Sequence, residues 1–219
     1  ATATSSREVA LKVACRHQDA RAVALLLREL SGVALGAPAG MAFFAGARAK
    51  PSPVIRLFST LVDKSSLELK LIDASAETTF IPPTAPLGVS AARETRIPDI
   101  DGSPRSPLVE VPLETLAWGR SGDKGDKANI GVIARKPDYL PWIATTLTEA
   151  YVADRFAHFM TSPGIDRYYL PGISALNFLL HNALGGGGIA SLRNDPQAKA
   201  FAQVLLDTPI MIPQHLLEA

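Results

Sequence analysis

Between Asp73 and Pro112 the chain carries seven prolines, and this segment limits how the protein can fold more than any other feature of the sequence. Proline has no N–H to offer a sheet ladder and holds φ near one value, so such a density favours extended backbone. The segment is also longer than most loops inside a compact domain. We therefore predict two modules, residues 1–75 and 110–219, joined by a proline-rich linker over 76–109.

The first module shows two kinds of periodicity. Apolar and polar residues alternate over 8–15, which predicts a strand, and apolar residues recur every three or four positions over 18–30, which predicts a helix. Residues 53–61 and 67–72 are typical of two further strands, with the polar residues 63–66 as the turn between them. The pattern predicts a small β-α-β-β module.

The second module mixes strands and helices without a regular alternation. The residue patterns predict strands over 113–118, 129–134, 167–170 and 209–213, and helices over 139–160, over 174–184 and after Asp195. Such an irregular mixture favours helices packed on one face of a mainly antiparallel sheet. We therefore expect an α+β protein made of two small two-layer modules.

Charge and composition exclude several classes of protein. The 219 residues include 22 Lys and Arg against 21 Asp and Glu, and a protein that binds nucleic acid usually has a clear basic excess. No apolar stretch reaches 18 residues and the first residues do not form a secretory signal, so we expect no membrane span and a cytoplasmic protein. A single cysteine, Cys15, excludes an internal disulfide and is consistent with a reducing compartment.

The segment from Gly119 to Lys127 is the most informative candidate site. Its nine residues combine three cations, two carboxylates, a hydroxyl and three glycines between two apolar segments. Glycine tolerates positive φ, so successive backbone N–H groups can converge on an anion here. Arg120 and Lys124 can pair with a carboxylate or phosphate, while Asp123 and Asp126 can orient these cations or act as acid and base. The alternative is a charge-balanced surface turn.

A second candidate site contains four consecutive glycines, Gly185 to Gly188, followed by Arg193. Fixing four glycines costs much backbone entropy, which favours a close approach to a ligand, a partner or a hinge. The alternative is a helix end that runs into a flexible loop. A long loop over 36–53, with Arg48 and two phenylalanines, is a third candidate that either covers a ligand or another subunit or is a plain surface loop.

The four histidines are scattered and form no metal-binding pair, so we predict no metal site. His181 near the glycines is either a base or a half-buried, hydrogen-bonded residue. No redox-cofactor motif is present, and the cofactor is left open. The predicted catalytic residues are Asp123, Asp126 and Lys124, and the predicted substrate-binding residues are Arg120, Ser121, Gly122, Asn129, Gly186, Gly187 and Arg193.

Three segments resemble the acyclic terpene utilisation AtuA family, in the order in which that family carries them. Residues 120–132 read RSGDKGDKANIGV, residues 170–188 read LPGISALNFLLHNALGGGG, with SLR at 191–193, and residues 44–56 read FAGARAKPSPVIR. The resemblance implies a ferredoxin-like C-terminal domain over 110–219. It also implies that the first module is the tail of a longer N-terminal domain, so we expect a fragment or one subunit of a larger assembly.

The resemblance further implies a catabolic enzyme for an unsaturated or branched carboxylate or acyl-CoA, of the hydratase, lyase or isomerase type. In that hypothesis the ligand is a small anionic metabolite or a CoA thioester, bound by a homo-oligomer or by a complex with a larger chain that carries the N-terminal domain. The alternative hypothesis is a structural or assembly subunit whose larger partner carries the chemistry. An exposed apolar patch on the first module is the expected mark of that alternative.

Overall fold

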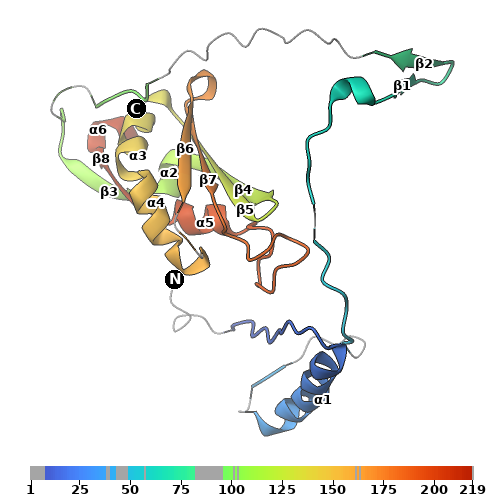
Figure 1. Cartoon of the computed structure of the whole chain (residues 1–219). Helices are drawn as coiled ribbons and strands as arrows, with labels where there is room; N and C mark the ends of the chain where they lie inside the picture. Colours follow the sequence, from blue (N-terminus) through green and yellow to red (C-terminus); the bar gives the residue numbers. More distant parts are fainter. Residues whose placement is uncertain are drawn as a thin grey trace.

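The computed structural model describes residues 8–37, 40–42, 49–56, 58–81, 96–100, 102, 104–160, 162 and 164–218 (Figure 1). Arg48, both phenylalanines of the predicted covering loop and much of the proline-rich segment lie outside the described residues.

The N-terminal half contains one long helix and one hairpin. Helix α1 (Ala20–Gly36) confirms the predicted helix, and Asp19 caps it by accepting a hydrogen bond from the N–H of Arg21. After the 3-10 turn η2 (Lys64–Ser66), strand β1 (Leu69–Ile72) pairs antiparallel with β2 (Glu77–Phe80).

Two of the strands predicted in this half are wrong. The described residues of 8–15 and 53–61 form neither helix nor strand, because no neighbouring strand offers them a ladder of hydrogen bonds. The strand predicted over 67–72 does form, but its partner is β2, within the segment predicted as linker. None of the described side chains from 8 to 81 is buried.

The C-terminal half is built on two antiparallel sheets. Strands β3 (Leu108–Pro112) and β8 (Pro209–Pro213) form a two-stranded sheet. Strands β4 (Ala117–Lys124), β5 (Lys127–Ala134), β7 (Ala175–Leu180) and β6 (Ile165–Leu170) form a four-stranded sheet in that spatial order. The helices are α2 (Leu113–Leu116), α3 (Leu140–Thr146), α4 (Glu149–Arg155), α5 (Phe201–Leu206) and α6 (Gln214–Leu217), with 3-10 turns η3 (Pro137–Tyr139), η4 (Ala157–Phe159) and η5 (Pro171–Ile173).

The core lies between the helices and one face of the four-stranded sheet (Figure 1). Alternate residues of β5 and β7 face it, among them Ile130 and Val132 on β5 and Leu176 and Phe178 on β7. The residues between them point to the opposite face of the sheet, which we call the open face. This arrangement confirms the predicted α+β class.

The helix predicted over 139–160 is two short helices, α3 and α4, because the chain is interrupted at Leu147 and Thr148. Thr148 restarts the helix by accepting a hydrogen bond from the N–H of Tyr151. The guanidinium of Arg167 on β6 donates to the carbonyls of Ala144 and Leu147, which satisfies acceptors left open at the end of α3.

Three further predictions in this half need correction. The segment predicted as a strand over 113–118 begins as helix α2 before β4, and the third helix begins at Phe201. The helix predicted over 174–184 is strand β7, whose residues lie between β5 and β6 and bond to both. Burial of alternate apolar residues in this central position overrides the helical propensity of alanine and leucine.

Candidate functional site

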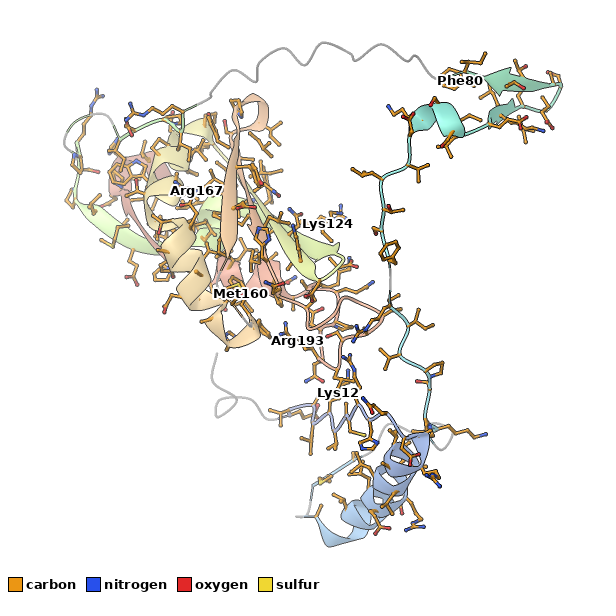
Figure 2. The ribbon with its side chains drawn as sticks, in the orientation of Figure 1. Lys12, Phe80, Lys124, Met160, Arg167 and Arg193 are labelled. Carbon is orange, nitrogen blue, oxygen red and sulfur yellow. The ribbon has the colours of Figure 1, made fainter. Side chains whose placement is uncertain are left out.

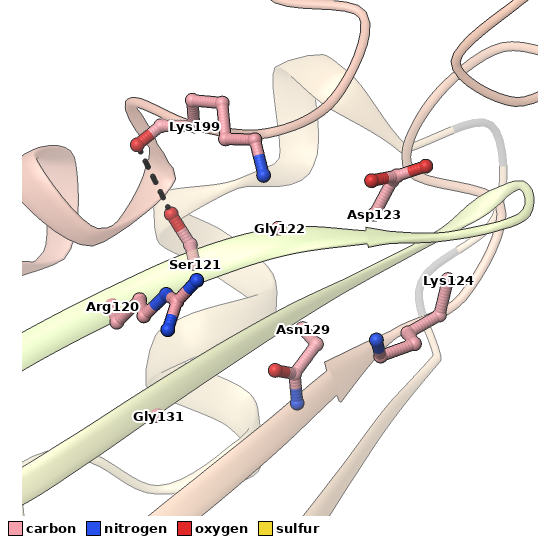
Figure 3. A pocket seen from close by; sticks show the side chains of 8 residues that line it. All are labelled: Arg120, Ser121, Gly122, Asp123, Lys124, Asn129, Gly131 and Lys199. Atoms are coloured by element: carbon pink, nitrogen blue, oxygen red, sulfur yellow. Dashed lines mark hydrogen bonds between the residues drawn. The ribbon is translucent and has the colours of Figure 1, made fainter. Parts of the chain in front are cut away.

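The polar segment 119–127 is a tight hairpin, with β4 and β5 paired up to Lys124 and Lys127 and only Gly125 and Asp126 in the turn. A strand sends successive side chains to opposite faces, so this segment divides its polar groups between two faces. Ser121 and Asp123 face the helix side, whereas Arg120, Gly122 and Lys124 lie on the open face (Figure 3). By the same alternation Gly119 also belongs to the helix side.

A hollow of about 440 Å³ lies around Gly122 (Figure 3). It is lined by Arg120, Ser121, Gly122, Asp123, Lys124, Asn129, Gly131 and Lys199. Arg120 and Lys124 flank Gly122 along β4, and Asn129 lies directly opposite it on β5. The ammonium of Lys199 reaches the same place, 3.5 Å from where a Cβ of Gly122 would lie. Because Gly122 and Gly131 have no side chains, the strands leave room between these polar groups.

The charge at this hollow is unbalanced. Three cations, Arg120, Lys124 and Lys199, line it together with one carboxylate, Asp123. In the part of the chain that the structure describes, none of the three cationic groups has a side-chain partner. The arrangement therefore offers an anion several charged donors at once.

Ser121 lines the hollow, but its hydroxyl is engaged elsewhere. The Oγ donates to the carbonyl of Ala198 at 2.6 Å and accepts from the N–H of Ala202 at 2.8 Å, and the residue is only 7% exposed. A further bond, to the carbonyl of Lys199, is drawn in Figure 3. Since α5 has no capping side chain of its own, Ser121 supplies an acceptor for its first turn. This geometry gives Ser121 a structural role.

Asp126 holds the glycine segment onto the hairpin. Its carboxylate accepts a hydrogen bond from the N–H of Gly186 at 2.7 Å, and its carbonyl accepts from the N–H groups of Ala183 and Leu184. Gly187 has a φ of +89°, and a Cβ there would lie 3.3 Å from the carbonyl oxygen of Gly125. The glycines therefore permit a close approach between two segments of this chain, and Asp126 faces that contact.

Asp123 lies between the first hollow and a second one of about 570 Å³. The second hollow is lined by Arg16, Arg56, Ser59, Asp123, Gly125, Asp126, Gly186, Gly187, Gly188, Ile189, Ala190 and Gln197. A Cβ at Gly188 would lie 3.4 Å from the Asp123 carboxylate, so this glycine leaves that carboxylate accessible. Of the two predicted acids, only Asp123 lines both hollows.

Arg193 does not line either hollow. Its guanidinium donates to the carbonyl of Phe159 and lies 5.8 Å from the centre of that ring. Its own carbonyl accepts a hydrogen bond from Lys12 at 2.5 Å (Figure 2). Nearby, Arg16 donates to the carbonyl of Ala190. These contacts place Arg193 where the N-terminal segment meets the loop after the glycines.

The open face carries further polar groups that the sequence analysis did not assign to the site. The Nδ2 of Asn129 donates to the Oδ1 of Asn177 at 2.5 Å. On β6, Asp166 is hydrogen-bonded to His181, with 2.8 Å between its Oδ2 and the Nε2, and accepts from the hydroxyl of Tyr168 at 3.3 Å. The sequence does contain a pattern that predicts part of this group: if 175–181 is interpreted as a strand, Asn177 and His181 lie on the same face.

The bond from His181 lowers the pKa of Asp166, with smaller contributions from the charge of His181, the Tyr168 hydroxyl and the charge of Lys127. The negative charge of Asp166 in turn raises the pKa of Tyr168. The three side chains therefore form a coupled polar group on the face that also carries Arg120.

Among the described residues, no group of three or more His, Cys, Asp or Glu side chains could hold a metal ion. Within the same residues, no helix has the length and apolar character needed to cross a membrane.

Two family models match the chain. Residues 111–211 match the AtuA ferredoxin-like domain, and residues 1–72 match the acyclic terpene utilisation family protein AtuA. Comparison with curated proteins and with solved structures finds no match. The first match confirms the ferredoxin-like expectation for the C-terminal half. Together the two matches cover most of the sequence, and the chain belongs to the acyclic terpene utilisation family AtuA.

Proposed function

We propose that the hollow around Gly122 binds the anionic group of a metabolite. We further propose that the chain is part of a catabolic enzyme that acts on an unsaturated or branched carboxylate or acyl-CoA, of the hydratase, lyase or isomerase type. The observation that carries the proposal is the convergence of Arg120, Lys124 and Lys199 without side-chain partners among the described residues. Membership of a terpene utilisation family supports a substrate of this kind.

Each residue around the hollow has a separate part in this proposal. Arg120 presents a planar fork of donors that matches a carboxylate or phosphate, and Lys124 and Lys199 add point charges on either side. The amide of Asn129, held by its bond to Asn177, is a neutral donor or acceptor opposite Gly122. Asp123 is the predicted acid or base with access to bound ligand, whereas Asp126 is occupied by the N–H of Gly186.

Titration calorimetry on the full 219-residue chain tests the binding step. The probes are but-3-enoyl-CoA, free but-3-enoate and inorganic phosphate, which distinguish a carrier phosphate from a carboxylate. We expect Arg120→Gln to weaken binding about 10- to 100-fold, because a hydrogen bond to a charged group contributes about 1.5–3 kcal/mol. Gly122→Val fills the hollow without changing its charge and should also weaken binding.

Two variants serve as controls. Lys64→Gln removes one positive charge from an exposed position in the N-terminal half, and Gly172→Ala adds a methyl group where nothing lies within 4 Å. Both should bind the probes like the wild type. Equal affinity of the wild type, Arg120→Gln and Gly122→Val for every probe would contradict the proposal.

A second candidate function, that of an assembly subunit, is favoured by the N-terminal half. Many of its large apolar side chains are exposed, and Phe58 and Leu61 are 86% and 101% accessible. Apolar surface of this extent marks an interaction site. In this hypothesis residues 8–81 complete a core together with a larger partner chain.

Hydrogen exchange tests the assembly hypothesis. In the isolated chain, amides of 8–81 should exchange far faster than those of β5 and β7, and native mass spectrometry of the protein from its source should show a second, larger chain. Slow exchange over 8–81 in the isolated chain would contradict this hypothesis and leave the anion site untouched.

A further inference from the structure

We infer that His181, in place of Asp123, is the proton-transfer residue of this protein, that Asp166 positions it, and that the substrate is an acyl thioester on a phosphate-bearing carrier lying across the open face. The inference rests on the proposed function, since it takes the hollow around Gly122 as the place where the carrier phosphate binds. It adds the group that acts on the acyl chain and the class of substrate that can reach it.

His181 is held in one orientation on the open face. Its backbone N–H donates to the carbonyl of Gly164 at 2.9 Å. Gly164 has no side chain, and this leaves space for His181, because a Cβ on Gly164 would lie 3.4 Å from the Cβ of His181. The His181 side chain is 29% exposed and that of Asp166 is 48% exposed. The pair is therefore fixed by packing yet open to a ligand.

The bond to Asp166 decides which nitrogen of His181 can act. The Nε2 carries the hydrogen that it donates to the Asp166 carboxylate, an assignment that follows from the acceptor-only chemistry of a carboxylate. The Nδ1 is then the basic nitrogen, and within the described residues it has no hydrogen-bond partner. When Nδ1 takes up a proton, the negative charge of Asp166 stabilises the imidazolium.

Two asparagines and one leucine lie on the open face between the hollow and this pair. Gly122, Asn129, Leu179 and Asp166 are in register across the four strands, and the side-chain hydrogen bond between Asn129 and Asn177 lies at the middle of the sheet. The Nδ2 of Asn177 has no partner among the described residues and is available as a donor to a substrate oxygen. A ligand that crosses the open face therefore meets the two asparagines between the hollow and His181.

The distance across the sheet selects the substrate. Two interstrand spacings separate β4 from β7, and His181 lies two residues beyond Leu179, so Gly122 and His181 are roughly 12 Å apart. In a free short-chain acid the reacting carbon is bonded directly to the carboxyl carbon, so an acid held at Arg120 keeps that carbon away from His181. A thioester on a long carrier can place its phosphate in the hollow around Gly122 and its acyl group at His181 at the same time.

The proposed step is a proton transfer without net oxidation. The Nδ1 of His181 removes a proton from the α carbon of a β,γ-unsaturated thioester, and the electron pair of that C–H bond delocalises onto the thioester oxygen, which Asn177 faces. The thioester carbonyl then re-forms and the former C–H pair becomes the α,β double bond. At the same time the β,γ double bond breaks, and its electron pair takes the proton from the imidazolium at the γ carbon. Atoms and electrons balance, and the reaction is an isomerisation.

The test follows but-3-enoyl-CoA in D₂O with the full chain by NMR, which reports deuterium uptake and the appearance of but-2-enoyl-CoA. His181→Gln should lower the rate at least about 100-fold, the lower range for general acid–base catalysis, with unchanged affinity for the thioester. Asp166→Asn should lower the rate with the same unchanged affinity, and Asp166→Glu should restore part of it. His158→Gln, an exposed histidine whose ring packs on Phe159, is the matched control and should keep the wild-type rate.

The two proposals fail in different ways. Loss of affinity in Arg120→Gln with normal affinity in His181→Gln supports the anion site, and loss of rate in His181→Gln alone supports the proton-transfer role. A wild-type rate in His181→Gln, loss of affinity in that variant, or absence of both deuterium uptake and but-2-enoyl-CoA in a wild type that binds the thioester would overturn the inference. Exchange of free but-3-enoate as fast as its thioester would overturn the substrate class, and a wild type that binds no thioester would overturn both proposals.

Discussion

The carboxylate of Asp126 accepts a hydrogen bond from the backbone N–H of Gly186 at 2.7 Å and so joins the β4–β5 turn to a segment sixty residues further along the chain. Its carbonyl accepts two more bonds from the same segment, at 3.0 and 3.1 Å. The turn and the glycine segment therefore form one structural unit beside the hollow.

The first prediction concerns this bond. Asp126→Ala removes the acceptor and should lower the free energy of unfolding by about 1–3 kcal/mol, with faster hydrogen exchange of the Gly186 amide. Asp126→Asn keeps an oxygen acceptor and should lose less. Denaturant unfolding measures both variants. Full stability of Asp126→Ala together with loss of turnover would instead indicate that Asp126 acts in catalysis.

The second prediction concerns the hydroxyl of Ser121, which binds the first turn of α5 from a neighbouring strand. Ser121→Ala leaves the N–H of Ala202 without this acceptor and should destabilise the protein by about 1–2 kcal/mol. Ser52→Ala, at an exposed position where the hydroxyl has no hydrogen-bond partner among the described residues, should change stability by no more than about 0.5 kcal/mol. If both variants unfold at the same urea concentration as the wild type, the cap contributes nothing.

The third prediction concerns Gly187. Its φ of +89° is strained for any residue with a side chain, and a Cβ there would crowd the carbonyl oxygen of Gly125 at 3.3 Å. Gly187→Ala should destabilise the protein by about 1–3 kcal/mol. Gly172→Ala, where nothing lies within 4 Å, is the matched control and should have little effect. Thermal unfolding of the two variants measures the difference. Equal melting temperatures would contradict a close approach between Gly187 and Gly125.

The fourth prediction concerns pH. The hydrogen bond from His181 lowers the pKa of Asp166 below its usual value of 3.8. A lowered pKa in the folded state means that the contribution of this carboxylate to stability is present above its unfolded pKa and is lost as pH falls through the folded pKa. In His181→Gln the pKa of Asp166 should rise toward its usual value. A ¹³C NMR titration of the carboxyl carbon measures the shift, and an unchanged value would exclude the bond in solution.

The sequence predicts the C-terminal fold class better than the individual elements. Strands with clear alternation, such as 129–134, and the proline-bounded strand at 209–213 are confirmed, because their pattern matches a half-buried ladder. Residues 174–184 are different: their apolar residues stand in short runs instead of alternating, and such runs do not distinguish a central strand from a helix. The segment is a strand because it pairs with β5 on one side and with β6 on the other.

The sequence also predicts only the part of the candidate site whose residues lie close together along the chain. Arg120, Gly122, Lys124 and Asn129 all line the first hollow, as their spacing suggested, and their functional roles stay predictions. Lys199 is at least 70 positions away from each of them along the chain, so no local pattern could connect it with them. Asp166 and His181 meet across two strands, and that pairing depends on a register that the predicted helix hid.

The two glycines that open the hollow have a consequence for evolution and engineering. Gly122 and Gly131 lie inside strands, where glycine is a poor strand former and where a β-branched residue would fit without a backbone clash. Thermal selection alone should therefore enrich valine, isoleucine or threonine at these two positions, and the most heat-resistant variants should be those that have closed the hollow. Stability and ligand access compete at the same two backbone positions.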